Sequence, residues 1–519
     1  MLLGPKFSKE NGNSLNGTFI PFLPGSREEK VDQVLGIIRD NYVDPVNVDS
    51  LRNSAINDIL KGLDPHSSYL PPVEARTFSE DLDGNYNGIG IEYLLLNDTL
   101  LVTGVNKSGP AARAGVRTGD KVLKIGKTSI AGPGITSTKV VELIRGRRGT
   151  YVYLTIRRPG FSSNKVIPVV RDRITVSSID ASYMLKGKTG YIKISKFGGE
   201  TSEDFENELT RLKSYGMKSL ILDLRENGGG YLSAATALAD QFLPEKRLIV
   251  YTKGAHEPRT DYYSSGKGIF KQGQLVVLID ENTASASEIV AGAVQDLDRG
   301  TIIGRRSFGK GLVQEQFNFG DGSALNLTVA RYYTPSGRSI QRSYTKGANA
   351  YYEEVLNRYK SGELSSDRHH LMDSLYKKNK IYHTASGRLI YGGGGIMPDI
   401  YVPLDTAGYN DLYFALNAKG VMNDFLYSYL VREPVPTSSV QAFIDHFSLT
   451  TKHYKKLFAL AFAKGIKYDD HLFKEAQMHI GSDLKAMLAR YYFGEEGYYK
   501  VLNYNDQAIA RSLAIIKQP

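Results

Sequence analysis

Two short apolar segments, each followed by a loop of small residues and a helix-like pattern, constrain the fold most strongly. Residues Leu220–Leu224 run into the glycine-rich stretch Asn227–Gly230, and Leu275–Ile279 is followed by the Ala- and Ser-rich loop 283–287. Apolar strands that alternate with helices are typical of a sheet buried inside an α/β layer. We therefore predict an α/β core with two strand–loop–helix units.

The chain has 519 residues, too many for a single hydrophobic core, so several domains are expected. The pattern predicts a flexible leader at 1–26, an N-terminal helical region at 27–80, a β-rich block at 81–172, the core at 173–404 with a Tyr-, Lys- and Ser-rich insertion at 342–390, and a C-terminal helical region at 405–519.

Periodicity refines this division. Strands are predicted at 100–105, 151–157 and 191–194, and helices at about 28–38, 51–63 and 139–144 and from about Leu232 and Ala286. Thr201 is predicted to cap a further helix, with Asp204 at the spacing of a capping box.

Composition excludes several classes of site. Cysteine is absent, which rules out a thiol nucleophile, disulfides and thiolate metal ligands. The net charge is +10, but the Lys and Arg residues are scattered, so we predict a solvated basic face and no nucleic-acid site. Gly84–Gly90 lacks the Lys and Ser or Thr of a phosphate loop, and no HExxH motif occurs. His369 and His370 are expected to be exposed, and neither a metal nor a cofactor is predicted.

Ser285 is the candidate nucleophile. It precedes a predicted helix, where unpaired backbone amides create positive potential, and the amide of Ala286 could help to bind an oxyanion. The simpler alternative is that Ser285 or Ser287 only caps the helix.

Lys310 is the candidate base, because no histidine lies between His256 and His369. Lowering the pKa of a lysine by about 3 units corresponds to roughly 4 kcal/mol, which burial can supply. The alternative is a solvated loop lysine. Gln314 could orient Lys310 only if the flanking glycines bend the chain, since four residues of strand span about 13 Å.

Read together, these segments resemble the carboxyl-terminal processing, or tail-specific, proteases. The resemblance covers about residues 27–404 and is carried by residues 223–230, 283–292, 309–314, 333–341 and 395–399, preceded by the PDZ-like β-rich block. It implies a serine endopeptidase with Ser285 as nucleophile, Lys310 as general base and Gln314 as orienting residue.

The resemblance also implies the binding groups. The oxyanion hole would use the amides of Ala286 and Gly229, with Gly228 as the alternative because the family often has proline at that position. The PDZ-like domain would hold a substrate's terminal carboxylate at Gly88, Ile89, Gly90 and Ile91, and Ile89 and Ile91 would line a pocket for its last side chain.

The implied fold is a multidomain α+β protein, with a ClpP/crotonase-like α/β core, an inserted PDZ-like β domain, and helical N- and C-terminal regions. Expected partners are proteins or peptides with exposed C-terminal tails, an adaptor protein, and further copies of the chain bound through the helical regions. The expected location is the bacterial cell envelope, in the periplasm, with the export signal or anchor outside this sequence. Two rival functions are a catalytically silent PDZ scaffold and an acyl-CoA enzyme of crotonase type.

Overall fold

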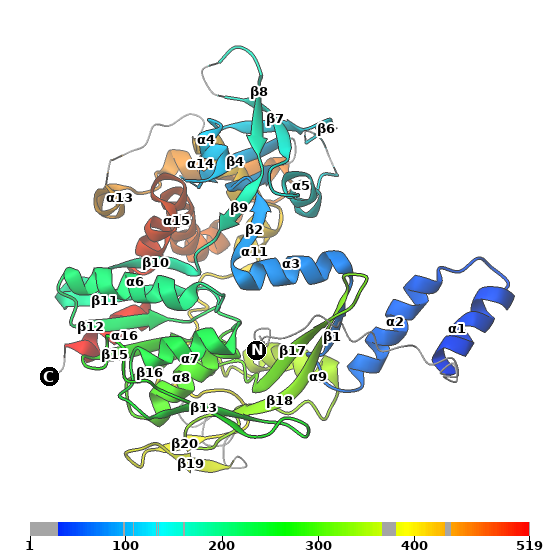
Figure 1. Ribbon diagram of the computed structural model, residues 1–519. Coiled ribbons are helices and arrows are strands. Elements are labelled where there is room, and N and C mark those ends of the chain that lie inside the picture. The colour runs from blue at the N-terminus through cyan, green and yellow to red at the C-terminus, as the bar shows by residue number, and fades with distance from the viewer. Residues whose placement is uncertain are drawn as a thin grey trace.

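The computed structural model describes residues 30–517, apart from 97–98, 107, 131, 133, 159–160, 366–379, 431–436 and 438. The predicted leader and part of the predicted insertion, including His369 and His370, lie outside these residues. Figure 1 shows an α/β core at the bottom, a β-rich block at the top, C-terminal helices behind and beside the block, and an N-terminal helical pair to the right.

The predicted α/β layer is confirmed. Its six-stranded sheet has the order β10 (Ile179–Met184), β11 (Thr189–Ile194), β12 (Ser219–Asp223), β15 (Leu275–Ile279), β16 (Thr301–Gly304) and β21 (Ile400–Tyr401). All neighbouring pairs from β11 onward are parallel, and β10 is antiparallel to β11. Helices α6 (Thr201–Ser214), α7 (Leu232–Asp240) and α8 (Ala286–Asp296) belong to this layer.

Alternate side chains of the buried strands enter two different cores. Leu220 and Leu222 lie in the core that includes α6, α7 and α8, whereas Ile221 lies in a core with Ala508 and Ile509. These last two residues belong to α16 (Gln507–Ile516), near the end of the chain. Both faces of the sheet are therefore covered, which explains why its strands are apolar along their whole length.

A second sheet joins the N-terminal region to the core. It contains β1 (Ser68–Leu70), β13 (Leu248–Lys253), β14 (Thr260–Tyr263), β17 (Leu312–Asn318) and β18 (Ala324–Tyr333). β1 pairs with β18, so the chain that follows α1 (Lys30–Asn41) and α2 (Val48–Lys61) is part of this second sheet. The sequence pattern missed α3 (Pro72–Asp83), which follows β1.

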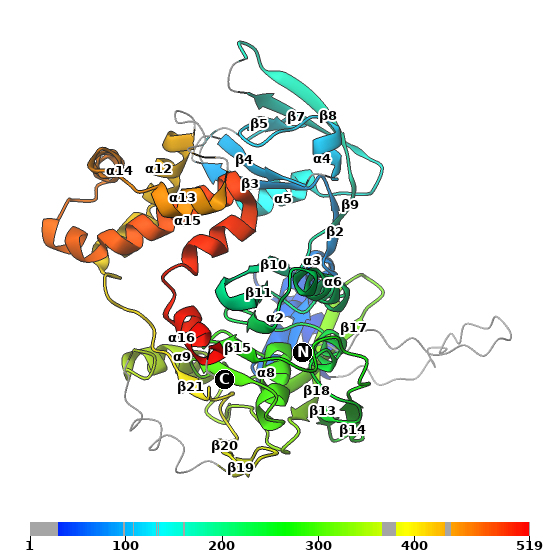
Figure 2. The same ribbon diagram turned by 90° about the vertical axis from the view of Figure 1, so that its left-hand side faces the viewer.

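The β-rich block has its own core. Its sheet runs β3 (Ile91–Leu96), β4 (Thr99–Val105), β5 (Lys121–Ile125), β7 (Tyr151–Arg157) and β8 (Lys165–Val170), with β6 (Thr128–Ser129) beside β5 and with helices α4 (Pro110–Arg113) and α5 (Ser137–Ile144). The antiparallel pair β2 (Asn85–Gly88) and β9 (Asp172–Thr175) connects the block to the core (Figure 2). Strand β3 lies at the edge of its sheet.

The C-terminal region is helical, as predicted. It contains α11 (Asp411–Ala418), α12 (Val421–Leu430), α13 (Val440–His446), α14 (Thr451–Ala463), α15 (Asp470–Leu502) and α16. Helix α15 packs against β4 of the block and β10 of the core, and α16 packs against β12 and β16 (Figure 2). The C-terminal helices therefore contact both the block and the central sheet.

One local prediction is wrong. Thr201 does not cap α6, because its hydroxyl accepts the backbone N–H of Gly198, and Asp204 accepts a hydrogen bond from Ser177 instead of completing a capping box. The residue at the N-cap position is Glu200. Tertiary contacts have replaced the local pairing that the spacing suggested.

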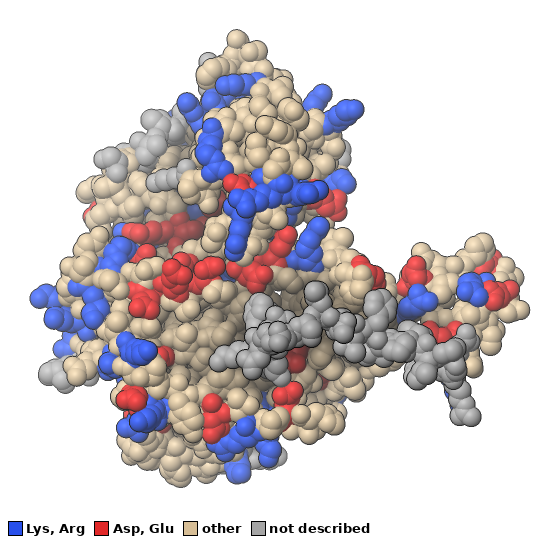
Figure 3. Space-filling model, in the orientation of Figure 1, with Lys and Arg blue, Asp and Glu red and all other residues tan. Residues whose placement is uncertain are grey.

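The charged surface is mixed. On the face in Figure 3, Lys and Arg side chains are spread over both the block and the core, and acidic side chains form a band where the two meet. None of the helices in the described part of the chain is long and apolar enough to cross a membrane.

Candidate active site

Ser285 lies at the N-cap of α8 in an unusual backbone conformation. Its φ is 58° and its ψ is −115°, although it is not a glycine. Such a conformation is strained and persists only where surrounding contacts impose it, which is common at functional sites. The Oγ atom is buried and has no hydrogen-bond partner among the described residues. Ser285 is thus placed as a nucleophile would be, and its hydroxyl does not cap the helix.

The glycine-rich loop 227–230 packs directly against Ser285. A Cβ atom added to Gly229 would lie 2.7 Å from the Cβ atom of Ser285, and Gly229 has a φ of +104°. The carbonyl of Asn227 accepts hydrogen bonds from the Ala284 amide at 2.9 Å and from the Ser287 hydroxyl at 3.0 Å. A side chain at Gly229 would therefore collide with the nucleophile turn.

The two predicted oxyanion donors differ in their present contacts. Within the described residues, the amide of Ala286 has no hydrogen-bond acceptor. The amide of Gly229 donates to Asn227 Oδ1 at 2.8 Å, so it is already occupied. The amide of Gly228 has no acceptor among the same residues, and Gly228 is exposed, with open space around it. Gly228 therefore presents the freer donor in this conformation.

Lys310 is partly buried beside the nucleophile loop. Burial lowers the pKa of its ammonium group to about 8, and the carboxylates of Asp64 and Glu288 act in the opposite direction. Its Nζ atom donates to Gln314 Oε1 at 2.8 Å. The bend that this contact requires comes from Gly309, which has a φ of +88°, and from an irregularity in strand β17 between Val313 and Gln314.

Glu288 is a buried residue that the sequence reasoning did not assign to the site. One oxygen of its carboxylate accepts the amides of Ser285 at 2.8 Å and Lys310 at 2.9 Å, and the other accepts the Gly309 amide at 2.7 Å and the Ser307 hydroxyl at 2.5 Å. Burial raises the pKa of Glu288, and these hydrogen bonds act against that shift. A single carboxylate therefore joins the nucleophile turn to the lysine loop.

Tyr332, on β18, makes a second link between these segments. Its hydroxyl lies 3.1 Å from the carbonyl oxygen of Ser285 and 2.9 Å from that of Lys310. The side chain is fully buried. The sequence around Tyr332 carries no local signal that its hydroxyl links these two segments.

His66 comes from the N-terminal region and reaches the same site. Its carbonyl oxygen accepts a hydrogen bond from Gln314 Nε2 at 2.5 Å, and its ring Nε2 lies 2.9 Å from the Tyr351 hydroxyl. Burial, followed by the positive charges of Lys310 and Arg342, lowers the pKa of His66 to about 3. With that pKa, the imidazole of His66 is neutral near pH 7.

The turn that carries His66 was visible in the sequence. Asp64 accepts the amides of His66 at 2.7 Å and Ser67 at 2.9 Å, and Asp-Pro is a familiar turn signal. The sequence pattern did not show that this turn contacts Gln314.

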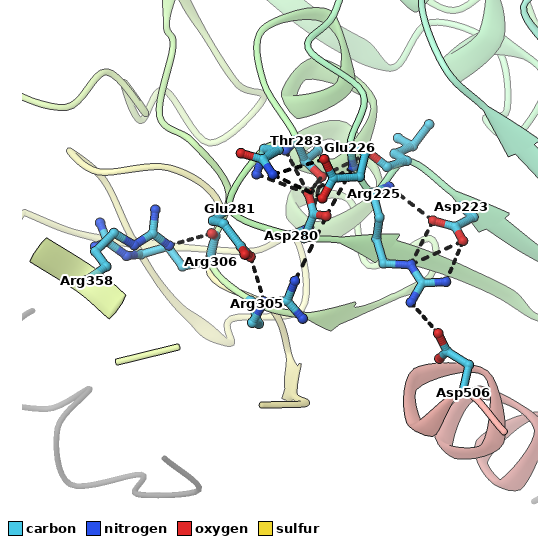
Figure 4. Close-up of polar contacts among 12 residues, drawn as sticks. Asp223, Arg225, Glu226, Asp280, Glu281, Thr283, Arg305, Arg306, Arg358 and Asp506 are labelled. Carbon is cyan, nitrogen blue, oxygen red and sulfur yellow. Dashed lines mark hydrogen bonds and ion pairs between the residues drawn. The ribbon is translucent and has the colours of Figure 1, made fainter. Parts of the chain in front are cut away.

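Charged residues join the glycine-rich loop to the loop that precedes α8 (Figure 4). The carboxylate of Asp280 accepts the amides of Glu226 at 3.0 Å and Thr283 at 2.9 Å, which ties the glycine-rich loop to the nucleophile loop. Arg225 pairs with Asp223 and with Asp506, the N-cap residue of α16, each at 2.7 Å. Burial alone would raise the pKa of Asp223, but Arg225 and Lys193 lower it to about 2.

The predicted carboxylate loop lies between β2 and β3 of the block. Gly90 has a φ of +74°, and no described residue accepts a hydrogen bond from the amides of Ile89 or Gly90. The side chain of Ile89 has no exposed surface, whereas Ile91 is partly buried. In this conformation the side chain of Ile89 belongs to the core of the block, and its backbone faces the loop.

Among the described residues, no group of three or more His, Asp or Glu side chains is arranged to hold a metal ion. The groups brought together around the start of α8 are a buried hydroxyl, an amine of lowered pKa and backbone amides that have no acceptor among the described residues.

Comparisons with known proteins identify the family of this chain. Residues 188–347 match Peptidase family S41, and residues 101–158 match the PDZ domain. A carboxy-terminal-processing protease of Bartonella bacilliformis is 39% identical over 309 residues, which are 59% of this chain and 70% of that protein. The chain belongs to the carboxy-terminal-processing protease family. It is therefore a member of a family of serine peptidases and carries a PDZ domain.

Other relatives of this carboxy-terminal-processing protease family member match a similar share of the chain. A Staphylococcus aureus protein described as a "Probable CtpA-like serine protease" is 34% identical over 315 residues, 60% of this chain and 62% of that protein. The solved photosystem II D1 C-terminal processing protease is 28% identical, with a TM-score of 0.34 over 60% of this chain and 89% of that one. Residues 412–494 match a family of unknown function (DUF8443).

Proposed function

We propose that this protein is a serine endopeptidase in which Ser285 is the nucleophile and Lys310 is the general base. The observation that carries the proposal is the buried Oγ of Ser285, which has no hydrogen-bond partner within the described part of the chain. It lies in a strained turn that shares Glu288 with the Lys310 loop. Burial keeps the pKa of Lys310 at about 8, so a useful fraction of the amine is neutral near physiological pH.

In the first half of the reaction, the neutral amine of Lys310 removes the proton from Ser285 Oγ as this oxygen attacks the substrate carbonyl carbon. The carbonyl π electrons move to oxygen. The resulting oxyanion accepts hydrogen bonds from the amide of Ala286 and from one amide of the glycine-rich loop, Gly228 or Gly229. Use of Gly229 would require its hydrogen bond to Asn227 to break.

The peptide bond then breaks, and the Lys310 ammonium gives its proton to the departing amine. This leaves an acyl ester on Ser285. A water molecule attacks the ester carbon while Lys310 accepts its proton, and the proton returns to Oγ as the ester bond breaks. Gln314 keeps the amine oriented through its hydrogen bond to Nζ.

The described residues include no hydrogen bond between Ser285 Oγ and Lys310 Nζ. Catalytic hydrogen bonds are often long in unliganded enzymes and shorten when substrate binds. We therefore assign the formation of this contact to the substrate complex.

The PDZ domain is proposed to hold the substrate's C-terminal tail. The edge strand β3 offers a free edge for strand addition, and the unpaired amides of Ile89 and Gly90 suit a terminal carboxylate. The envelope location, the adaptor protein and the homo-oligomer are further proposals that rest on the family resemblance.

A silent scaffold is disfavoured because it would not require a strained serine and a partly buried lysine of lowered pKa on adjoining loops. An acyl-CoA enzyme would not require a PDZ domain. Incubation of an unfolded protein with the wild type and with Ser285→Ala tests the proposal. We expect fragments only with the wild type, and equal cleavage by Ser285→Ala would refute it.

A further inference from the structure

Part of the predicted insertion packs against the loop that delivers Lys310. The insertion contains α9 (Ala348–Lys360), and Arg358 on this helix donates hydrogen bonds to the carbonyl oxygens of Arg306 at 2.5 Å and Ser307 at 3.2 Å. Glu354, one turn earlier, pairs with the Arg306 side chain at 3.0 Å. The helix therefore holds the residues that immediately precede Gly309 and Lys310.

This contact is a buried ionic cluster. Glu363 pairs with Arg306 at 2.7 Å and with Arg358 at 3.0 Å, and all three residues are less than one-tenth exposed. Burial would raise the pKa of Glu363, but the two arginines lower it. Removing one member of such a cluster leaves an uncompensated buried charge, which is strongly destabilising. The three side chains therefore depend on one another for their stability.

An aromatic cluster continues the contact toward the catalytic residues. The guanidinium group of Arg342 lies against the rings of Phe308 and Tyr351, 3.8 and 3.9 Å from their centroids, and the two rings meet edge to face. Tyr351 is almost fully buried and lies on α9. This packing fixes the direction of the Tyr351 hydroxyl.

The hydroxyl begins a chain of hydrogen bonds that ends at the base. Tyr351 bonds the ring of His66 at 2.9 Å, and the carbonyl oxygen of His66 accepts the side-chain amide of Gln314 at 2.5 Å. The other end of that amide, Gln314 Oε1, accepts Lys310 Nζ at 2.8 Å. His66 itself joins the two halves of this chain, because its ring contacts Tyr351 and its main-chain carbonyl contacts Gln314.

We propose that Tyr351 is a positioning residue for the general base, acting through His66 and Gln314 to direct the amine of Lys310. This inference rests on the proposed Ser285–Lys310 mechanism and adds a role for the insertion, whose helix α9 contacts the lysine loop on one side and His66 on the other.

The proposal predicts a change in pH dependence. A fixed Gln314 Oε1 stabilises the ammonium form of Lys310 more than the neutral amine, because charge-assisted hydrogen bonds are the stronger ones. If Gln314 becomes less ordered, the pKa of Lys310 should fall. Among the described residues, the other charged or titratable groups around Lys310 are the carboxylates of Asp64 and Glu288 and the ring of His66, with Arg342 beyond it. A Tyr351→Phe change alters none of their charges.

The test compares Tyr351→Phe with Tyr359→Phe and Lys310→Ala in a peptide-hydrolysis assay across pH 5.5–10. Tyr359 lies on the same helix with half of its surface exposed, so it serves as a matched control. We expect Tyr351→Phe to lower kcat about 10- to 100-fold with little change in KM, since small misplacement of a catalytic group has effects of this size. The acid limb of its kcat profile should move to lower pH.

Glu354→Gln provides a second variant, because it weakens the links from α9 to Arg306 and to Arg342 while leaving the Tyr351 hydroxyl in the chain. It should lower kcat in the same direction. If Lys310→Ala is inactive but Tyr351→Phe matches the control in kcat and in its acid limb, the inference is overturned and the proposed function stands. A lower kcat with an unmoved acid limb and a lower Tm would indicate a structural role only, and would also overturn it. Activity in Lys310→Ala would refute the proposed function itself.

Discussion

The side-chain amide of Gln314 donates a hydrogen bond to the main-chain carbonyl of His66 at 2.5 Å. His66 lies two residues before β1, and β1 pairs with β18 of the core. The N-terminal region thus completes the surroundings of Lys310. The following predictions concern this lysine, its neighbours and the PDZ domain.

Lys310→Ala should abolish peptide hydrolysis, with a loss of at least about 1,000-fold, because a nucleophile and its base act as a unit. Gln314→Ala should be milder, since Gln314 orients the base and transfers no proton. Initial rates on one peptide substrate, with circular dichroism to verify folding, measure both. A Lys310→Ala enzyme with near-normal turnover would contradict the assignment.

The rate should increase with pH. The proton acceptor is the neutral amine of Lys310, whose pKa is lowered to about 8, so kcat/KM should rise through pH 7 to 9 and level off above. A profile of kcat/KM from pH 5.5 to 10 measures this limb. A rate independent of pH over that range would argue against a lysine base.

Lys310→Met should stabilise the fold at neutral pH while removing activity. The folded-state pKa of about 8 lies below the ordinary value of 10.5, so the unfolded chain binds the proton more tightly. This difference lowers the stability of the wild type below pH 8 and disappears as pH rises to about 10.5.

The expected gain in the free energy of unfolding is about 1–3 kcal/mol at pH 7, and close to zero at about pH 10.5. Urea unfolding at both pH values measures it. Lys253→Met, at an exposed position at the end of β13, is the control and should show no such pH-dependent gain. The same result for both variants would show that Lys310 carries no burial penalty.

Glu288→Gln should destabilise the protein by about 2–4 kcal/mol and lower activity strongly. The carboxamide presents N–H groups where the carboxylate now accepts the amides of Ser285, Gly309 and Lys310, so buried donors lose their acceptor. Denaturant unfolding and peptide hydrolysis measure the two effects. Glu203→Gln, exposed on α6, is the matched control and should resemble the wild type. Normal stability of Glu288→Gln would mean that this carboxylate does not hold the two loops together.

Substrate capture should depend on a free C-terminal carboxylate. Amidating the tail of one unfolded substrate removes the charge that the amides of Ile89 and Gly90 are proposed to bind. A loss of about tenfold or more in affinity is expected, since charge-assisted hydrogen bonds contribute about 1.5–3 kcal/mol. Binding to the Ser285→Ala protein compares the two substrates without cleavage. Equal affinities would assign the PDZ domain a structural role.

Local patterns in the sequence predicted much of the layer and its reactive loops. Helix α8 begins directly after Ser285, and the strand at Leu275–Ile279 has the predicted bounds. The roles of Tyr332 and His66 escaped prediction because their partners lie far away along the chain. Glu288 contacts Ser285 locally, but its contacts to Ser307, Gly309 and Lys310 cross to another loop. Thr201 shows the same limit in reverse, since its capping pattern was present but tertiary contacts used its hydroxyl differently.

The sequence by itself determined the order of strands and helices, the exclusion of thiol chemistry and the family, because periodicity and short motifs are properties of neighbouring residues. Only the tertiary structure decided which groups meet Lys310 and how far burial lowers its pKa. It also decided that the amide of Gly229 donates to Asn227, whereas the amide of Gly228 has no acceptor among the described residues. These properties depend on desolvation and on distances between segments as remote as His66 and Tyr351. Packing sets both, and local spacing does not encode them.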